Sequence, residues 1–219
     1  RYTMMQKGQY YNGTSNHLDH NNNPDYWDVL LGDLKDSNKW TNKIALDFAC
    51  GKGRNVFNMS SLCKWERIDG IDLSFNNIEY CKSNYKNINS NWYCNDGVSV
   101  SNLNSNEYDF VMSTIALQHI PVYDIRRSIL LDILRTLKPG GLFSFQMGYG
   151  KGLDDPFGRE KSSYYENSWD ASGTNSIHDV RVQSEEEIIT DLKDIGYINI
   201  STVIKDSFSD KGHPQWIYV

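Results

Sequence analysis

The chain has 219 residues, a formal net charge of -6 at pH 7 and an isoelectric point near 5.3. Its 22 lysine and arginine residues are spread along the chain, which excludes the basic stripe expected of a protein that binds duplex nucleic acid. The length suits one α/β domain with a modest appendage. No apolar run approaches the roughly 18 to 20 residues of a membrane span, so the sequence predicts no membrane partner.

Four cysteines, Cys50, Cys63, Cys81 and Cys94, lie far apart and form no C-x-x-C pair. This spacing argues against a zinc site and against a redox couple. We interpret the cysteines as reduced side chains with structural roles, which indicates a cytoplasmic protein. We see no cluster of residues in the sequence that predicts a metal.

Residues 1–40 are polar and aromatic, and only the stretch "YWDVLLGDL" among them looks helical. We predict that this segment is a cap or lid. Residues 41–219 alternate between strand and helix patterns, which is typical of an α/β domain. Strands are predicted at 44–49, 67–73, 91–95, 108–114 and 142–147, and "YINISTVI" and "PQWIYV" supply the last two.

Helices are expected between most of these strands. One begins near residue 54, and another follows Ser74, whose residue type is favoured at helix N-termini. In "SEEEIITDLKDIG", Ser184 and Glu187 have the spacing of a capping box, and Gly196 marks the end of the helix. A further helix is expected to begin at Pro121 and to end at "KPGG", with apolar residues at helical spacing: Ile125, Ile129, Leu130, Ile133, Leu134 and Leu137.

This alternation predicts a doubly wound, Rossmann-like α/β fold with a seven-stranded, mostly parallel sheet. The last two strands are joined by a short loop, so they are expected to pair antiparallel. Residues 148–183 show no sustained periodicity and are longer than an ordinary connection, and we interpret them as a lid-like insertion in the domain.

The stretch "IALDFACGKGRNV" places a predicted buried strand directly before Gly51 and Gly53. Glycines between a strand and a helix leave backbone N–H groups uncovered, so a ligand can lie against the main chain. Asp72 closes the next strand, where an acid can accept hydrogen bonds from both hydroxyls of a ribose. Asp96 follows the third strand and can accept from an exocyclic amine. Together they predict a nucleoside pocket, although each residue alone is also typical of an ordinary turn or helix cap.

The segments "LDFACGKGRN", "IDGIDLS", "CNDG", "YDFVMSTIALQHI" and "LKPGGLFSF" follow in the order and spacing of the class I S-adenosylmethionine-dependent methyltransferases, which the sequence resembles over about residues 40–149. The resemblance implies S-adenosyl-L-methionine as cofactor and S-adenosyl-L-homocysteine as product. The cofactor-binding residues that it implies are Asp47, Ala49, Gly51 and Gly53 for the methionyl part, Asp72 for the ribose with Leu73 beside it, Asp96 and Gly97 for the adenine, and the main chain of Ser113 for the amino group. Ala49 departs from the family, which usually has glycine there.

Methyl transfer from a sulfonium is an in-line displacement that depends on alignment and on exclusion of water. A hydroxyl or ammonium acceptor must also lose a proton to a base. The candidates for that base are His119, in "LQHIP" after the fourth strand, and His178, in the insertion. His119 has an alternative interpretation as a cap of the helix expected at Pro121.

Aromatic residues in and beside the insertion are predicted to enclose the acceptor, because ring faces exclude water and attract cationic amines. These candidate substrate-binding residues are Tyr149, Tyr164, Tyr165 and Trp169. The alternative is that the rings only pack the insertion onto the sheet.

We therefore expect a methyltransferase that acts on a nucleophilic O, N or S atom of a small molecule, as a monomer or homodimer and without a nucleic-acid partner. Two other classes stay open. An NAD(P)-dependent oxidoreductase also has a strand, a glycine turn and a later acid, although Val56 stands where the third glycine of its fingerprint would be. A non-catalytic module that binds S-adenosylmethionine is the other.

Overall fold

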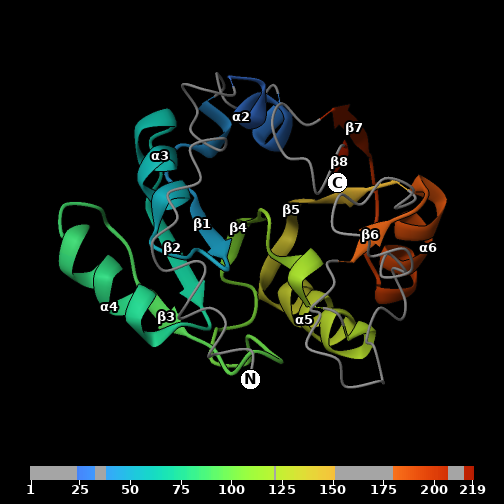
Figure 1. Ribbon diagram of the computed structural model, residues 1–219. Coiled ribbons are helices and arrows are strands. Elements are labelled where there is room, and N and C mark those ends of the chain that lie inside the picture. The colour runs from blue at the N-terminus through green and yellow to red at the C-terminus, as the bar shows by residue number, and fades with distance from the viewer. Residues whose placement is uncertain (1–23, 33–37, 121, 151–179, 207–214) are drawn as a thin grey trace. The chain divides into compact units, whose positions relative to one another are not determined.

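The structure is a computed structural model, and it describes residues 24–32, 38–120, 122–150, 180–206 and 215–219. The chain divides into two compact units: unit 1 comprises residues 1–112 and 136–143, and unit 2 comprises residues 113–135 and 144–219. Helices and strands alternate along the described chain (Figure 1), which confirms the α/β class expected from the sequence.

Unit 1 contains the parallel strands that follow one another early in the chain. Its elements are α2 (Pro24–Leu31), η3 (Asn38–Trp40), β1 (Ile44–Phe48), α3 (Arg54–Leu62), β2 (Arg67–Asp72), α4 (Phe75–Asn84), β3 (Trp92–Cys94), nearly all of β4 (Tyr108–Ser113) and the first half of β5 (Leu137–Tyr149). Their strand order is β3-β2-β1-β4-β5. β1 pairs in parallel with β2, and β2 pairs in parallel with β3, where Asp72 lies opposite Cys94.

The core of unit 1 explains why β1 is an apolar run. A parallel strand covered on both faces needs apolar residues at consecutive positions, and Ala45, Leu46 and Phe48 are all buried. Helices α3 and α4 both contact β2, and α4 also contacts β3 (Figure 1). The carboxyl ends of β1 and β2 thus meet the amino ends of two helices, which is the arrangement the glycine motif predicts.

Unit 2 contains the antiparallel end of the sheet. Its elements are η4 (Leu117–His119), nearly all of α5 (Tyr123–Thr136), the second half of β5, β6 (Arg181–Val182), α6 (Glu185–Ile195), β7 (Val203–Asp206) and β8 (Gln215–Tyr218). β8 pairs antiparallel with both β5 and β7, as the short final loop predicts. β6 pairs in parallel with β5, so the described residues contain eight strands where seven were expected. A strand of two residues has no periodicity to detect.

Helix α6 begins and ends as its sequence predicts. The Ser184 hydroxyl accepts a hydrogen bond from the Glu187 amide at 3.2 Å, and the Glu187 carboxylate accepts from the Gln183 amide at 2.9 Å. The returning bond therefore reaches one residue further back than in the usual capping box. Gly196 ends the helix in the left-handed conformation, with φ 118.

Two predicted boundaries are wrong. Leu137 was expected in the helix, but α5 ends at Thr136 and "KPGG" lies inside β5, whose Lys138 pairs with Asp109 at 2.7 Å. Tertiary pairing along β5 outweighs the local tendency of Pro and Gly to break structure. Of the predicted strand "YINISTVI", only the last two residues belong to a strand, β7, which continues to Asp206; Asn199 adopts a left-handed φ of 55 that interrupts an extended chain.

The proposed cap at 1–40 and the insertion at 148–183 are described only in part. Within the first segment, α2 confirms the helical pattern of "YWDVLLGDL" and buries Trp27. The second includes the end of β5 and all of β6. Residues 151–179, like Pro121, lie outside the described residues. The roles of cap and lid stay predictions.

The buried Asp69 carboxylate connects β2 to β4 and to the residue before β3. Asp69 is fully buried in β2 and accepts from Arg67 Nε at 2.9 Å and from the Tyr108 hydroxyl of β4 at 2.9 Å. It also accepts from the Asn91 amide, directly before β3, at 2.8 Å. Arg67 pairs in addition with Glu107. Burial raises the pKa of Asp69, whereas the Asn91 amide and Arg67 lower it.

We predict that Arg67→Met lowers the free energy of unfolding by about 3 to 5 kcal/mol, because it leaves the buried Asp69 charge without its counter-ion. Denaturant titration measures this change. Lys82→Met is the matched control, since Lys82 pairs with Glu79 on an exposed helix face and its loss costs no more than about 0.5 kcal/mol. Equal losses in the two variants would contradict the role of Asp69.

Candidate functional site

The turn between β1 and α3 has free space beside Gly51 and is tightly packed against side chains at Gly53. Gly51 and Gly53 both have left-handed φ values, +54 and +76. A Cβ at Gly51 would meet nothing within 4 Å, whereas a Cβ at Gly53 would lie 2.7 Å from Tyr85 and 2.9 Å from Trp92. Gly53 therefore serves the packing of the unit, and Gly51 leaves open space against the main chain where a ligand can lie.

Asp72, at the end of β2, is joined directly to this turn. One carboxylate oxygen accepts from the Gly51 amide at 2.8 Å. The other accepts from the Ser74 amide at 2.8 Å and from the Asn77 side-chain amide at 3.3 Å. Burial raises the pKa of Asp72, and these three donors lower it. Ser74 is the N-cap of α4, as predicted, and its hydroxyl accepts from the Asn77 amide.

Asp47, in β1, is a buried carboxylate of a different kind. It is 1% exposed, and in the described part of the chain neither of its oxygens meets the geometry of a hydrogen bond. Burial raises its pKa to about 7, against the lowering influence of Asn55 and Arg54. A buried polar group without a partner points to a ligand or to a site of function.

Ala49 has the conformation of the glycine that the family usually has there. Its φ is 60, in the left-handed region that costs an L-residue about 1 kcal/mol. The backbone of the turn thus follows the glycine pattern in spite of the alanine side chain, which is half-buried.

Asp96 and Gly97 form the loop after β3. Asp96 is exposed and accepts from the amides of Val98 at 2.9 Å and Ser99 at 2.8 Å, and these bonds lower its pKa. It therefore has the turn-forming role that was the alternative interpretation. Gly97 has φ +83, and a Cβ there would lie 3.1 Å from Leu73, which is half-buried. The adenine contact of this loop stays a prediction.

The remaining predicted residues that the structure describes belong to unit 2. Ser113 ends β4 fully buried, and its hydroxyl has no hydrogen-bond partner in the described chain. His119 is half-buried at the end of η4, and Tyr149 is half-buried at the end of β5. His178, Tyr164, Tyr165 and Trp169 lie outside the described residues.

Sequence reasoning missed three residues around the turn. A Cβ at Gly70, inside β2, would lie 2.5 Å from the Trp92 ring, so this strand glycine marks a close approach. Asn77 and Cys81 on α4 contact Asp72 and the Gly51 carbonyl, respectively. The glycine within a strand pattern was a detectable signal. Nothing in the pattern of α4 distinguishes these two polar residues from others on the helix.

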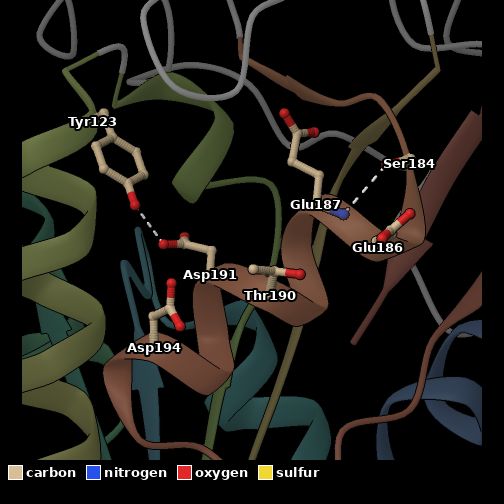
Figure 2. A pocket seen from close by; sticks show the side chains of 7 residues that line it. All are labelled: Tyr123, Ser184, Glu186, Glu187, Thr190, Asp191 and Asp194. Atoms are coloured by element: carbon tan, nitrogen blue, oxygen red, sulfur yellow. Dashed lines mark hydrogen bonds between the residues drawn. The ribbon is translucent and has the colours of Figure 1, made fainter.

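Unit 2 has a second candidate, a pocket of about 340 Å³ at α6 (Figure 2). It is lined by Tyr123, Ser184, Glu186, Glu187, Thr190, Asp191 and Asp194. The Tyr123 hydroxyl donates to buried Asp191 at 2.5 Å. Glu186 and Glu187 lie in the first turn of α6, where the helix dipole favours negative charge. The described residues contain no grouping of His, Cys, Asp or Glu suited to a metal ion. Glu186, Glu187 and Asp191 thus have structural roles in unit 2, and the turn of unit 1 is the stronger candidate.

We predict that Asp47 makes the free energy of unfolding of the ligand-free protein depend on pH. The pKa of Asp47 is about 7 in the folded protein, against an ordinary value of 3.8 for an aspartate. Stability is therefore highest below pH 4 for this group and falls by up to about 4 kcal/mol as pH rises to about 7, because only the unfolded chain ionises freely there. Denaturant titrations of wild type and Asp47→Asn at pH 5 and pH 8 measure the slope. The variant should lose most of it, and identical slopes would contradict the assignment.

Comparisons with known proteins agree with the geometry of unit 1. Residues 46–145 match the family model of a methyltransferase domain. No curated protein matches the chain. No helix among the described residues is long and apolar enough to cross a membrane.

Several solved structures have similar folds. An S-adenosylmethionine-dependent methyltransferase from Clostridium acetobutylicum has a TM-score of 0.64 at 19% identity, over 88% of each chain. A chain of the Haloferax volcanii complex between the Trm112 methyltransferase activator and a methyltransferase has a TM-score of 0.63 at 15% identity, over 88% of each chain. Phosphoethanolamine N-methyltransferase 2 of Haemonchus contortus, bound to S-adenosyl-L-methionine, has a TM-score of 0.52 at 20% identity, over 76% of this chain and 35% of that one.

At such identities the likeness shows the fold alone. The chain has the class I, Rossmann-like fold of the S-adenosylmethionine-dependent methyltransferases, and its residues 46–145 match the family model of a methyltransferase domain.

Proposed function

We propose that this chain transfers a methyl group from S-adenosyl-L-methionine to a nucleophilic O, N or S atom of a small molecule, and that the cofactor binds at the glycine turn of unit 1. The observation that carries this proposal is the buried Asp72 carboxylate, hydrogen-bonded at 2.8 Å to the Gly51 amide of a turn that is open to a ligand. The match of residues 46–145 to a methyltransferase domain supports it.

The residues of the turn fit this cofactor. Asp72 supplies carboxylate oxygens for ribose hydroxyls; burial raises its pKa, and three hydrogen-bond donors that favour the ionised form partly offset this. Gly51 leaves the main chain uncovered. Asp47 is a buried acid whose oxygens accept no hydrogen bond of normal geometry among the described residues. Burial outweighs the influence of Asn55 and Arg54 on its pKa, and a cationic group of a ligand beside it would further favour the ionised form. When bound, S-adenosyl-L-methionine supplies an electrophilic methyl group on a positively charged sulfur.

The chain's own part in the chemistry is to hold the cofactor, to exclude water and to accept a proton. Methyl transfer needs alignment more than covalent help, and good alignment is worth up to about 7 to 11 kcal/mol of the barrier. We propose His119 as the base for an acceptor that must lose a proton, because an imidazole can act as a general base and this one is half-buried at the end of η4. His178 is the second candidate from the sequence.

The acceptor is proposed to be a small molecule handled in the cytoplasm by a monomer or homodimer. The net charge of -6 makes a nucleic-acid substrate unfavourable, because phosphates would be repelled. The four cysteines are free thiols, as expected in a reducing compartment. Tyr149 at the end of β5 is the candidate acceptor contact in the described chain, and Tyr164, Tyr165 and Trp169 are proposed beside it from the sequence.

We predict that wild-type protein binds S-adenosyl-L-methionine and S-adenosyl-L-homocysteine, and that Asp72→Ala weakens both by at least about tenfold. The reason is the loss of charged hydrogen bonds to the ribose, worth about 1.5 to 3 kcal/mol. Isothermal titration calorimetry with a folded variant measures this. NAD is the control ligand, since Val56 is buried where a dinucleotide site requires glycine. Tight binding of NAD alone would overturn the proposal.

We predict that His119→Ala lowers turnover by about 100-fold or more with an acceptor that must be deprotonated, while cofactor affinity stays near that of wild type. Turnover is followed with labelled methyl donor after a screen of small-molecule acceptors. His119→Gln controls for the loss of side-chain volume. Turnover equal to that of wild type across a pH series would remove His119 from the mechanism.

A further inference from the structure

Asn77 and Cys81 lie one turn apart on α4, so their side chains share one face of the helix. Both are buried, with exposed fractions of 7% and 0%. Each contacts a different part of the glycine turn site. The remaining polar residues of α4 are exposed, so Asn77 and Cys81 are the polar side chains that this helix buries.

Asn77 holds the Asp72 carboxylate from the helix side. Its side-chain amide donates to the same oxygen that accepts from the Ser74 amide, at 3.3 Å. The donor also lowers the pKa of Asp72, against the burial that raises it. The carbonyl oxygen of Asn77 is buried, and it has no hydrogen-bond partner in the described chain. A buried carbonyl oxygen without a hydrogen bond lowers the stability of the ligand-free protein. We therefore interpret the contact of Asn77 with Asp72 as functional and not only as stabilising.

Cys81 holds the Gly51 peptide from the same helix. Its thiol donates to the Gly51 carbonyl at 3.5 Å, and the Cys50 thiol donates to the same oxygen at 3.7 Å. Asp72 accepts from the N–H of Gly51. The peptide groups on both sides of Gly51 are therefore held by side chains, at a position where glycine itself imposes no single conformation. Cys81 also packs behind Gly53, where a Cβ would lie 3.0 Å from its sulfur.

In the described part of the chain, no charged group is among the causes that lower the pKa of Asp72. Its charge raises the pKa of Asp47 on β1, of Cys50 in the turn and of Cys94 on β3. Arg54 on α3 acts on Asp47. The neutral donors at Gly51, Ser74 and Asn77 are the groups that lower the pKa of Asp72 against the larger effect of burial, which raises it.

We propose that Asn77 and Cys81 are positioning residues for the cofactor: the first keeps the Asp72 carboxylate oriented, and the second keeps the Gly51 carbonyl in place. Neither is proposed to touch the cofactor. This inference rests on the proposed function, because it assumes that Asp72 and Gly51 form the cofactor site. It means that α4, through one buried face, sets the affinity for the ligand held by β1 and β2.

The test uses S-adenosyl-L-homocysteine and calorimetry over a pH series, with the full chain. Asn77→Leu keeps the volume and removes the donor, and we expect about tenfold weaker binding at neutral pH. Its loss of binding on acidification should also begin at a higher pH than in wild type, because Asp72 without that donor is protonated more readily. Asn76→Leu, the same change at the exposed neighbouring position, should leave both unchanged.

Cys81 supplies a second, independent variant pair. Cys81→Ser keeps a donor toward Gly51 and should bind like wild type, whereas Cys81→Ala should bind about two- to fivefold more weakly. Cys63→Ala, at a half-buried position outside the site, is the control.

The outcomes separate the inference from the function on which it rests. Wild-type protein that fails to bind S-adenosyl-L-homocysteine would overturn the proposed function. Wild-type binding with an unchanged affinity and pH profile in Asn77→Leu, or with equal affinities for Cys81→Ser and Cys81→Ala, would overturn the positioning role. A variant that is less stable than wild type but binds S-adenosyl-L-homocysteine with wild-type affinity would also overturn the positioning role. If Asn77→Leu does not fold, the Cys81 pair decides.

Discussion

The candidate site depends on one hydrogen bond, from the Gly51 amide to the Asp72 carboxylate at 2.8 Å. A buried charge is tolerated only where donors replace the water that it has lost. This bond supplies one such donor, and it also joins the turn after β1 to the end of β2. Neighbouring parallel strands end at the same edge, and the observed register, with Phe48 opposite Ile71, brings the turn after β1 to the end of β2. The pairing of β1 with β2 therefore determines both the sheet and the geometry of the site.

Two buried carboxylates beside this turn, Asp72 in β2 and Asp47 in β1, differ in the hydrogen bonds that they accept. Asp72 has three donors that favour its charged form. Asp47 has none with hydrogen-bond geometry in the described chain, and burial raises its pKa to about 7. The first acid is prepared to accept from hydroxyls. The second is poised to become charged when a cation arrives, since an opposite charge lowers a carboxyl pKa. A ligand with hydroxyls at one end and positive charge at the other matches the pair.

The glycine motif serves two separate purposes that a motif search does not distinguish. Gly53 is required because Tyr85 and Trp92 occupy the space of a side chain, whereas the space that a side chain at Gly51 would take is open, as the proposed cofactor site requires. Ala49 shows that the turn keeps its left-handed backbone even where a Cβ is present. The helix α4 then completes the site from behind, through Asn77 and Cys81, with contacts that the motif does not contain. Among the acids around the α6 pocket, Glu186 and Glu187 lie in the first turn of the helix, where capping and the helix dipole favour negative charge.

Local chemistry determined what the sequence alone could predict: the apolar run of β1, the N-caps Ser74 and Ser184, the stop at Gly196, and the acid that closes β2. Each depends on residues close together in the chain, so periodicity and capping rules suffice. Only the tertiary structure decided the start of β5 within "KPGG", the two-residue strand β6, and the contacts of Gly70, Asn77 and Cys81 with groups up to 30 residues away. It also decided that Asp96 forms a turn and that Asp47 is without a hydrogen-bond partner in the described chain. Burial and partner choice are properties of packing between distant segments, and no local pattern encodes them.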